Sequence, residues 1–215
     1  HSLPSCPVRC PPPKKGVESR RPIVFIPSIM EDEYNIGQEI EIKLDLGSFT
    51  NYLKLIGFLG QIDREDRQVN SFFDSEDRRL AADGWALRIR TDEHAGFVTL
   101  KSRESENAEA SVRNELEAEV ERRVALAVQD LRQDILSLDV PPIKFVHERW
   151  GDLQLSKLVH FENTRQTKAF KLGDYMYNLE VDTTRFSDGT IDYELEVELP
   201  DEAQVVVVAD KLQRL

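Results

Sequence analysis

Three pairs of glutamates separated by a single residue are the first candidates for chemistry along the chain. The pairs are Glu39/Glu41, Glu115/Glu117 and Glu194/Glu196. Successive side chains of a β-strand point to opposite faces, so both members of such a pair lie on the same face. Carboxylate clusters without His or Cys favour hard, oxygen-preferring cations, and we therefore expect a site for Mg²⁺ or Mn²⁺.

Basic residues complete the pattern with the same spacing. The set comprises the pair Arg88/Arg90 and the single residues Lys43, Lys101, Arg113 and Arg165. Guanidinium and ammonium groups suit phosphate oxygens. With Asp182 added to the carboxylates, these groups sum to −1, and two divalent ions would make the sum +3. A cleft that holds both sets would be a polyphosphate–metal site.

Strands must position these side chains. Alternation of apolar and charged residues predicts roughly eight strands in mostly hairpin succession. They cover residues 38–46, 67–74, 85–91, 97–103, 112–120, 158–161 leading into 163–170, 175–182 and 193–199. Residues 112–120 also fit one long helix with the segment after them, but their alternation favours a strand.

Three helices are expected beside the strands. Ser48 can cap a helix over residues 49–56 that ends at Gly57. From Glu121 the apolar spacing changes to three and four, which predicts a helix through Leu138, closed off by Pro141 and Pro142. Residues 202–215 are typical of a terminal helix. The expected fold class is α+β, with a closed or nearly closed antiparallel sheet.

Two arrangements of this sheet satisfy the alternation. The apolar faces could form a central core with the charges in water. Alternatively, the charges could line the inside of a closed sheet, with helices covering the apolar outer faces. Enclosing so many charges costs several kcal/mol each unless they are paired or carry ligands. The second arrangement is therefore expected only where the site binds something highly charged.

An ordered series of motifs resembles the CYTH domain, also called the triphosphate tunnel metalloenzyme family. The series begins with Glu39-Ile-Glu-Ile-Lys43, similar to the ExExK signature, and covers about residues 38–200. It continues through Asn70-Ser-Phe-Phe-Asp74, Leu87-Arg-Ile-Arg90, Val98-Thr-Leu-Lys101, Arg113-Asn-Glu-Leu-Glu117, Phe161-Glu-Asn-Thr-Arg165, Leu179-Glu-Val-Asp182 and Tyr193-Glu-Leu-Glu196. The resemblance implies an eight-stranded antiparallel β-tunnel with a charged interior and flanking helices, which favours the inward-charged arrangement.

The resemblance also implies roles for individual residues. Lys43, Arg88, Arg90, Lys101, Arg113 and Arg165 would hold a triphosphate. Glu39, Glu41, Glu194 and Glu196 would bind Mg²⁺ or Mn²⁺, with Asp182, Glu115 and Glu117 assisting. Glu39 and Glu41 would also be catalytic, because the family uses these positions to place the attacking water.

Three functions follow from the resemblance. The first is metal-dependent hydrolysis of the terminal phosphoanhydride of a triphosphate, with inorganic tripolyphosphate as the expected substrate. The alternatives are an adenylyl cyclase of the class IV type and a non-catalytic polyphosphate-binding module. Family members usually carry another phosphate-binding lysine after the terminal helix; here only Lys211, on the helix itself, is available. The aromatic residues are scattered along the strands, and the sequence indicates neither an adenine pocket nor a stacking platform for bases.

Composition excludes several other classes of protein. The net charge of −12 argues against a general nucleic-acid surface, which needs clustered Lys and Arg. No apolar run approaches the roughly 20 residues needed to cross a bilayer. We therefore expect a small-molecule triphosphate as the partner, with no membrane association and a cytoplasmic location. Oligomeric state cannot be read from the sequence.

The first 37 residues differ in composition from the rest of the chain. They contain both cysteines, Cys6 and Cys10, and are rich in proline, which is typical of a disordered tail or of residues added for expression. The segment 23–26 could dock as an edge strand. The expected organisation is therefore a tail over residues 1–37 and one triphosphate tunnel domain over residues 38–215, with no disulfide framework or thiolate zinc site.

Overall fold

Eight antiparallel strands form the body of the molecule. The structure, a computed structural model, describes residues 34, 36–106 and 110–214. The strands, in chain order, are β1 (Gly37–Asp45), β2 (Arg64–Asp74), β3 (Trp85–Thr91), β4 (Gly96–Glu106), β5 (Ser111–Val120), β6 (Ser156–Leu172), β7 (Tyr175–Phe186) and β8 (Ile191–Leu199).

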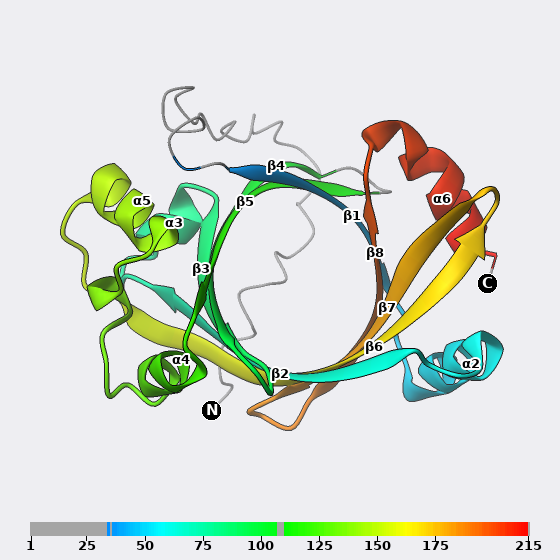
Figure 1. The fold of residues 1–215 in the computed structure, drawn as a ribbon, viewed down its shortest axis with the longest axis horizontal. Helices are drawn as coiled ribbons and strands as arrows, with labels where there is room; N and C mark the ends of the chain where they lie inside the picture. The colour runs from blue at the N-terminus through cyan, green and yellow to red at the C-terminus, as the bar shows by residue number, and fades with distance from the viewer. Residues whose placement is uncertain (1–33, 35, 107–109, 215) are drawn as a thin grey trace, which may run out of the picture.

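These strands close into a barrel in the order β1-β5-β4-β3-β2-β6-β7-β8 (Figure 1). β1 closes the ring, because it pairs with β5 along one edge and with β8 along the other. Every neighbouring pair is antiparallel. The α+β fold class and the closed eight-stranded antiparallel barrel are as the sequence predicts.

Helices cover the outside of the barrel in two groups. The α-helices of the described residues are α2 (Phe49–Leu59), α3 (Arg79–Ala82), α4 (Arg122–Gln129), α5 (Pro141–Trp150) and α6 (Val205–Leu212), and the short 3-10 turns are η1 (Ile135–Ser137) and η2 (Glu202–Gln204). Figure 1 shows α3, α4 and α5 on one side of the ring and α2 and α6 on the opposite side.

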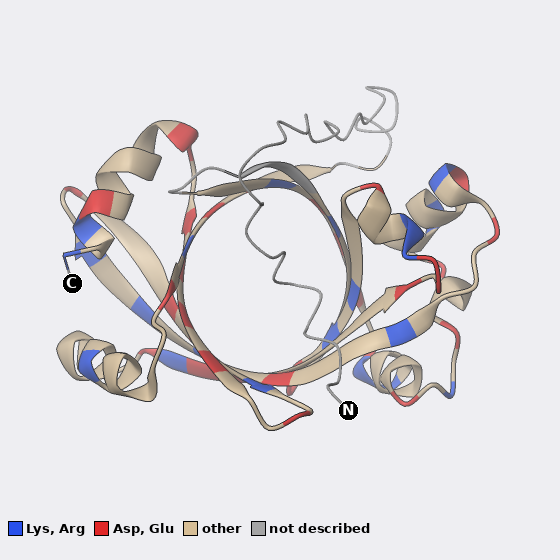
Figure 2. Cartoon of the chain, turned by 180° about the vertical axis from the view of Figure 1, so that it is seen from behind, with Lys and Arg blue, Asp and Glu red and all other residues tan. Residues whose placement is uncertain are grey.

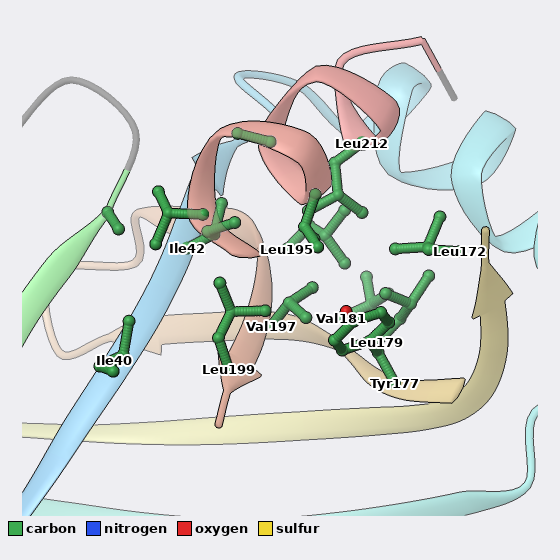
Figure 3. Packing of buried hydrophobic residues seen from close by; sticks show 14 of the residues in the cluster. Ile40, Ile42, Leu172, Tyr177, Leu179, Val181, Leu195, Val197, Leu199 and Leu212 are labelled. Atoms are coloured by element: carbon green, nitrogen blue, oxygen red, sulfur yellow. The ribbon is translucent and has the colours of Figure 1, made fainter. Parts of the chain in front are cut away.

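The apolar faces of the strands point outward, toward these helices. On the side of α2 and α6, buried strand residues such as Ile42, Leu179 and Leu195 belong to one cluster with Leu55 of α2 and Leu212 of α6. Figure 3 shows the strand residues of this cluster together with Leu212. On the other side, the buried residues of β3 and β4 pack against α4 and α5. The molecule thus has two hydrophobic cores outside the barrel, and the charged faces of the strands are left to line its interior.

Local signals explain where α2 begins and ends. The Ser48 side chain accepts a hydrogen bond from the Asn51 backbone N–H at 3.2 Å, which satisfies a donor of the first turn. The helix runs past Gly57 to Leu59, so its expected end at Gly57 is wrong. It ends where Gly60 takes a positive φ of 69° and its N–H bonds the Ile56 carbonyl.

The strand prediction for residues 112–120 is confirmed, since β5 covers Ser111–Val120. The prediction of one helix from Glu121 to Leu138 is wrong. α4 stops at Gln129, because Leu131 adopts a left-handed backbone with φ 59°. Pro141 and Pro142 begin α5 and do not close a helix. Proline has no backbone N–H, but this is tolerated in the first turn of a helix, where the backbone N–H groups have no partner within the helix.

Other boundaries also differ from the expectation. β6 is one continuous strand of 17 residues, where the sequence indicates two segments. The short helix α3, which the sequence did not indicate, begins at the end of the polar stretch that follows β2. Most of the proposed tail over residues 1–37, including residues 23–26 and both cysteines, lies outside the described residues, whereas Tyr34 and Ile36 pack against a hydrophobic core and Gly37 begins β1.

Candidate active site

The strand register brings the predicted site residues to the inner face of the barrel. Directly opposed residues of neighbouring strands share a face, and the opposed pairs include Glu39 with Arg113, Lys43 with Glu196, Lys101 with Glu115 and Arg165 with Asp182. Arg88, Arg90, Glu41, Glu117 and Glu194 alternate with outward residues of the two cores, so they face inward too. Figure 2 shows basic and acidic residues distributed around the ring.

One side of the interior is rich in carboxylates. Lys43, on β1, forms ion pairs with Glu196 and, at 3.6 Å, with Glu194, both on β8. The Glu41 and Glu196 carboxyl groups are hydrogen-bonded to each other. Arg113 reaches Glu41 at 3.8 Å from β5.

Arg165, on β6, joins the same cluster of carboxylates. Its Nε and Nη2 donate to the two oxygens of Asp182 at 2.9 and 2.6 Å. It also pairs with Glu180 and Glu196. The bidentate geometry fixes the orientation of the guanidinium plane.

Lys101 connects two of the predicted carboxylate pairs. Its Nζ lies 2.9 Å from Glu39 on β1 and 2.8 Å from Glu115 on β5. The lysine therefore holds the first carboxylate of the ExExK motif beside β4.

The opposite side of the interior is basic. Arg88 and Arg90 on β3 share a single carboxylate, Glu117, with Nη2 to Oε2 distances of 3.8 and 3.4 Å. The Thr99 hydroxyl donates to the same carboxylate at 2.7 Å. The Nε atoms of both arginines are buried and have no hydrogen-bond partner. Positive charge is therefore in excess here, and donors are available.

Burial and charge separate the acidities of neighbouring carboxyl groups. Burial, together with the negative charge of Glu196, raises the pKa of Glu41 to about 8. Although burial opposes it, the positive charges of Lys43 and Arg165 lower the pKa of Glu196 to about 2. At neutral pH the Glu41 carboxyl is protonated and donates its hydrogen bond to the ionised Glu196.

The remaining interior groups follow the same two influences. Burial raises the pKa of Glu115, Glu180 and Glu194. The pKa of Glu39 is lowered, because Lys101 outweighs the effect of burial. Burial and the neighbouring charge of Arg90 lower the pKa of Arg88.

The interior remains accessible to water. The side chains of Arg90 and Lys43 are 19% and 35% exposed, although both point into the barrel. A dry barrel core would leave such groups almost fully covered. The charged ring can therefore be reached by small polar molecules.

The chemistry of the carboxylates fits a divalent cation. Glu41 and Glu196 offer only oxygen donors and hold a proton between them, a position that a hard cation can take over. Within the described ranges, no three His, Cys, Asp or Glu side chains are already gathered as a metal centre. Ion pairs with Lys43 and Arg165 hold Glu194 and Asp182 instead.

The sequence did not single out two residues that the structure adds to the site. Glu180 pairs with Arg165, and Thr99 bonds Glu117. Glu180 is two residues from Asp182 in the same alternation, so that spacing could have revealed it. Lys211 lies elsewhere: a Cβ at Gly173, in the β6–β7 turn, would come within 2.3 Å of its Nζ.

The described part of the chain includes no helix long and apolar enough to span a membrane. Among curated proteins, none matches the chain.

Comparison with known families and solved structures gives a consistent result. Residues 37–215 match the profile of the CYTH domain. A Hippeastrum protein, described as an adenylyl cyclase candidate that reveals a dominant triphosphatase activity, is 26% identical, with a TM-score of 0.72 over 82% of this chain and 86% of that one.

A Bacillus halodurans protein described as an adenylate cyclase candidate is 21% identical, with a TM-score of 0.63 over 83% of this chain and 90% of that one. A Pyrococcus horikoshii protein is 17% identical, with a TM-score of 0.52 over 82% and 86% of the two chains. These two similarities bear on the fold alone.

Proposed function

The chain belongs to the CYTH domain family, and we therefore propose that it hydrolyses the terminal phosphoanhydride bond of a triphosphate in a reaction that depends on Mg²⁺ or Mn²⁺. The proposed substrate is inorganic tripolyphosphate, because the charged interior can hold it without any further contacts. The dominant triphosphatase activity described for the Hippeastrum protein supports hydrolysis over cyclisation.

One observation carries the proposal: the interior of the barrel is polarised. Arg88 and Arg90 share one carboxylate and have unpartnered Nε donors, whereas Glu41, Glu194 and Glu196 lie near Lys43 on the other side. A chain of phosphates needs donors along its length and a cation at its reacting end. A structural network of ion pairs would instead match each charge locally.

The basic residues would bind and orient the triphosphate. Arg88 and Arg90 can direct planar donors at phosphate oxygens, and Lys101 and Lys43 would add charge from β4 and β1. Arg113 and Arg165 stand beside the carboxylates, where they would contact the reacting phosphoryl group. These donors would stabilise the charge that develops on the phosphoryl oxygens.

The carboxylates would hold the cation and the attacking water. Glu39, Glu41, Glu194 and Glu196 are the proposed metal ligands, with Asp182, Glu115 and Glu117 in support, and Glu39 and Glu41 would also place the attacking water. A divalent cation bound there would neutralise phosphate charge and activate water. Glu39 stays ionised, held by Lys101, and would accept a hydrogen bond from that water.

Phosphate release from tripolyphosphate tests the proposal. We expect release with Mg²⁺ or Mn²⁺ and none in EDTA. Lys43→Ala and Arg90→Ala should each lower kcat/KM by roughly 100-fold or more, because each removes a donor aimed at the phosphates. Lys54→Ala, at an exposed position on α2, is the matched control and should retain activity.

The products separate the alternatives. Release that is independent of metal, or full activity in both variants, would contradict the proposal. Cyclic AMP and pyrophosphate from ATP would establish a cyclase instead. Binding of tripolyphosphate without turnover would establish a polyphosphate-binding module.

A further inference from the structure

Thr99 lies at the centre of the basic side of the interior. It is on β4, where it is directly opposed to Arg88 on β3 and to Glu117 on β5. Opposed residues share a face of the sheet, so Thr99 points into the barrel between the two charged side chains. It is 0% exposed, and its hydroxyl can both donate and accept hydrogen bonds. An uncharged residue therefore separates an arginine from a carboxylate in the charged ring.

A single oxygen atom of Glu117 is shared by three groups. Its Oε2 lies 2.7 Å from the Thr99 hydroxyl, but 3.4 Å and 3.8 Å from the Nη2 atoms of Arg90 and Arg88. Ion pairs with a direct hydrogen bond are usually about 2.7–2.9 Å long. Of the three groups, the neutral hydroxyl is therefore the closest to this oxygen, and the two guanidinium groups, called the arginine pair below, lie farther away.

The Thr99 hydroxyl also accepts a hydrogen bond from Arg88. The distance from Nη2 to Oγ1 is 3.3 Å, shorter than the 3.8 Å that separates Nη2 from Glu117. One hydroxyl thus gives the arginine an acceptor and the carboxylate a donor. Without it, each of the two charged groups would lose a partner, and a direct ion pair between them would be the nearest replacement. The Glu117 side chain is 31% exposed, which leaves it room for that movement.

The position of Glu117 decides how much positive charge a ligand meets. Burial, together with the neighbouring charge of Arg90, lowers the pKa of Arg88, so an anion beside the arginine pair is favoured. The Nε atoms of both arginines are buried without a hydrogen-bond partner. A carboxylate that closed on the arginine pair would neutralise it and occupy its donors, as a phosphate group would. At its present distance, Glu117 leaves these donors available.

We propose that Thr99 is a positioning residue, which holds the Glu117 carboxylate away from the arginine pair and so keeps both guanidinium groups available to phosphate. The inference rests on the proposed function for the identity of the ligand. Thr99 acts through Glu117 and needs no contact with the phosphates. When phosphate oxygens occupy the arginine donors, the hydroxyl keeps its hydrogen bond to Glu117, so the carboxylate is not left unsatisfied inside the barrel.

Equilibrium binding of inorganic tripolyphosphate in EDTA tests this role without turnover. Thr99→Val keeps the branched shape of the side chain and removes the hydroxyl. It should weaken binding about tenfold, because phosphate must then displace Glu117 from the arginine pair. Thr99→Ser returns the hydroxyl and should bind tripolyphosphate with nearly the wild-type affinity.

A second substitution shows whether Thr99 acts through Glu117. Glu117→Gln removes the competing charge, so this variant should bind tripolyphosphate at least as tightly as the wild type. In the Glu117→Gln background, Thr99→Val should change the affinity by less than about twofold, because no carboxylate remains to be held away. A threonine that contacted the phosphates itself, or that only shaped β4, would cause the same loss of affinity in both backgrounds.

Thr91→Val is the matched control. Thr91 is 2% exposed, and its hydroxyl also donates to a side-chain oxygen, that of Gln129 on α4, at 3.1 Å. Loss of this hydroxyl should lower the Tm and leave the affinity for tripolyphosphate unchanged. Thermal unfolding confirms that each variant is folded. The Glu117→Gln measurement tests the inference even if Thr99→Val does not fold.

Three results would each overturn the inference: wild-type affinity in Thr99→Val, an equal loss in both Glu117 backgrounds, or weaker binding by Glu117→Gln. So would a wild-type protein that does not bind tripolyphosphate in EDTA. Phosphate release with Mg²⁺ or Mn²⁺ is measured separately. If the affinities change as expected but no triphosphate is hydrolysed, the role of Thr99 stands and the proposed hydrolysis fails. If tripolyphosphate is hydrolysed but Thr99→Val binds it like the wild type, the reverse holds.

Discussion

Glu41 and Glu196 show how far an environment can separate two identical side chains. They are hydrogen-bonded to each other on neighbouring strands, yet the pKa of Glu41 rises to about 8 and that of Glu196 falls to about 2. Glu41 is buried beside a negative charge, whereas Glu196 lies beside Lys43 and Arg165. The pair therefore carries one proton at neutral pH.

This shared proton predicts a pH dependence of stability in the metal-free protein. Folded Glu41 keeps its proton up to a pKa of about 8, whereas the unfolded chain releases it near the ordinary value of 4.5. Stability from this group is therefore full below about pH 4.5 and is lost as the pH rises toward 8. Glu41→Gln removes the loss.

Thermal unfolding in EDTA measures the effect. The Tm of Glu41→Gln relative to wild type should rise by about 3 °C or more between pH 6 and pH 8. Glu119→Gln, at an exposed position on β5, is the control and should show a constant difference. A constant difference for Glu41→Gln as well would contradict the assignment of the proton.

Alternation predicted which charged residues share one face of a strand, but it left open whether that face lies inside or outside the barrel, and only the resemblance to the CYTH domain favoured the inside. Lys43, Arg88 and Glu194 are examples, and all face inward. The ion-pair and ring-contact partners of these residues were not predictable, because the sequence of a single strand does not determine its register with the neighbouring strand. The meeting of Phe161 with Phe186, and of Arg165 with Glu180, depends on that register.

At the level of elements, the close contact between α4 and the β3–β4 hairpin limits the size of the residue that can begin β4. Gly96 opens β4 beneath α4, and a Cβ there would come within 2.3 Å of the Ala125 Cβ and 3.1 Å of Val120. Any side chain at this position would push the helix away from the barrel.

Two glycine-to-alanine changes should therefore have opposite effects. Gly96→Ala should lower the free energy of unfolding by roughly 1–3 kcal/mol through overpacking. Gly57→Ala should raise it by about 0.5–1 kcal/mol, because Gly57 is exposed within α2 and its Cβ would meet nothing within 4 Å. Urea unfolding measures the free energy of unfolding of both variants. A change of the same sign in the two variants would contradict this account.

Helix boundaries between residues 121 and 150 could not be predicted from apolar spacing. Leu131 fits the helical period, but it takes a left-handed backbone and is 64% exposed. Ile135 and Leu138 keep their expected burial by another route, through η1, whose start is capped by Asp134. Apart from Leu131, the spacing thus identified side chains that pack against the barrel, but not the backbone that carries them.

At the scale of the whole molecule, the two hydrophobic cores lie on opposite sides of one barrel. They share no helix, yet the hydrogen-bonded ring connects them through every strand. The loss of either core would expose one face of the same closed sheet. We therefore expect the cores to unfold together.

Truncations in each core test this cooperativity. Leu87→Ala and Leu179→Ala remove fully buried side chains from the two cores, and each should lower a single Tm by roughly 5–15 °C. Leu53→Ala, at a residue 51% exposed on α2, should change it little. Calorimetry that resolves two transitions, with each variant shifting only one, would show that the cores unfold independently.

Closure of the ring by β1 and β8 also constrains when the protein can fold. Residues 40–45 of β1 pair with residues 194–199 of β8, so the final seam joins segments from the two ends of the domain. Contacts this distant in sequence are slow to form, because most of the chain must be ordered first. During synthesis, β1 has its last neighbour only after β8 has left the ribosome, so the charged interior is enclosed only once translation of the domain is nearly finished.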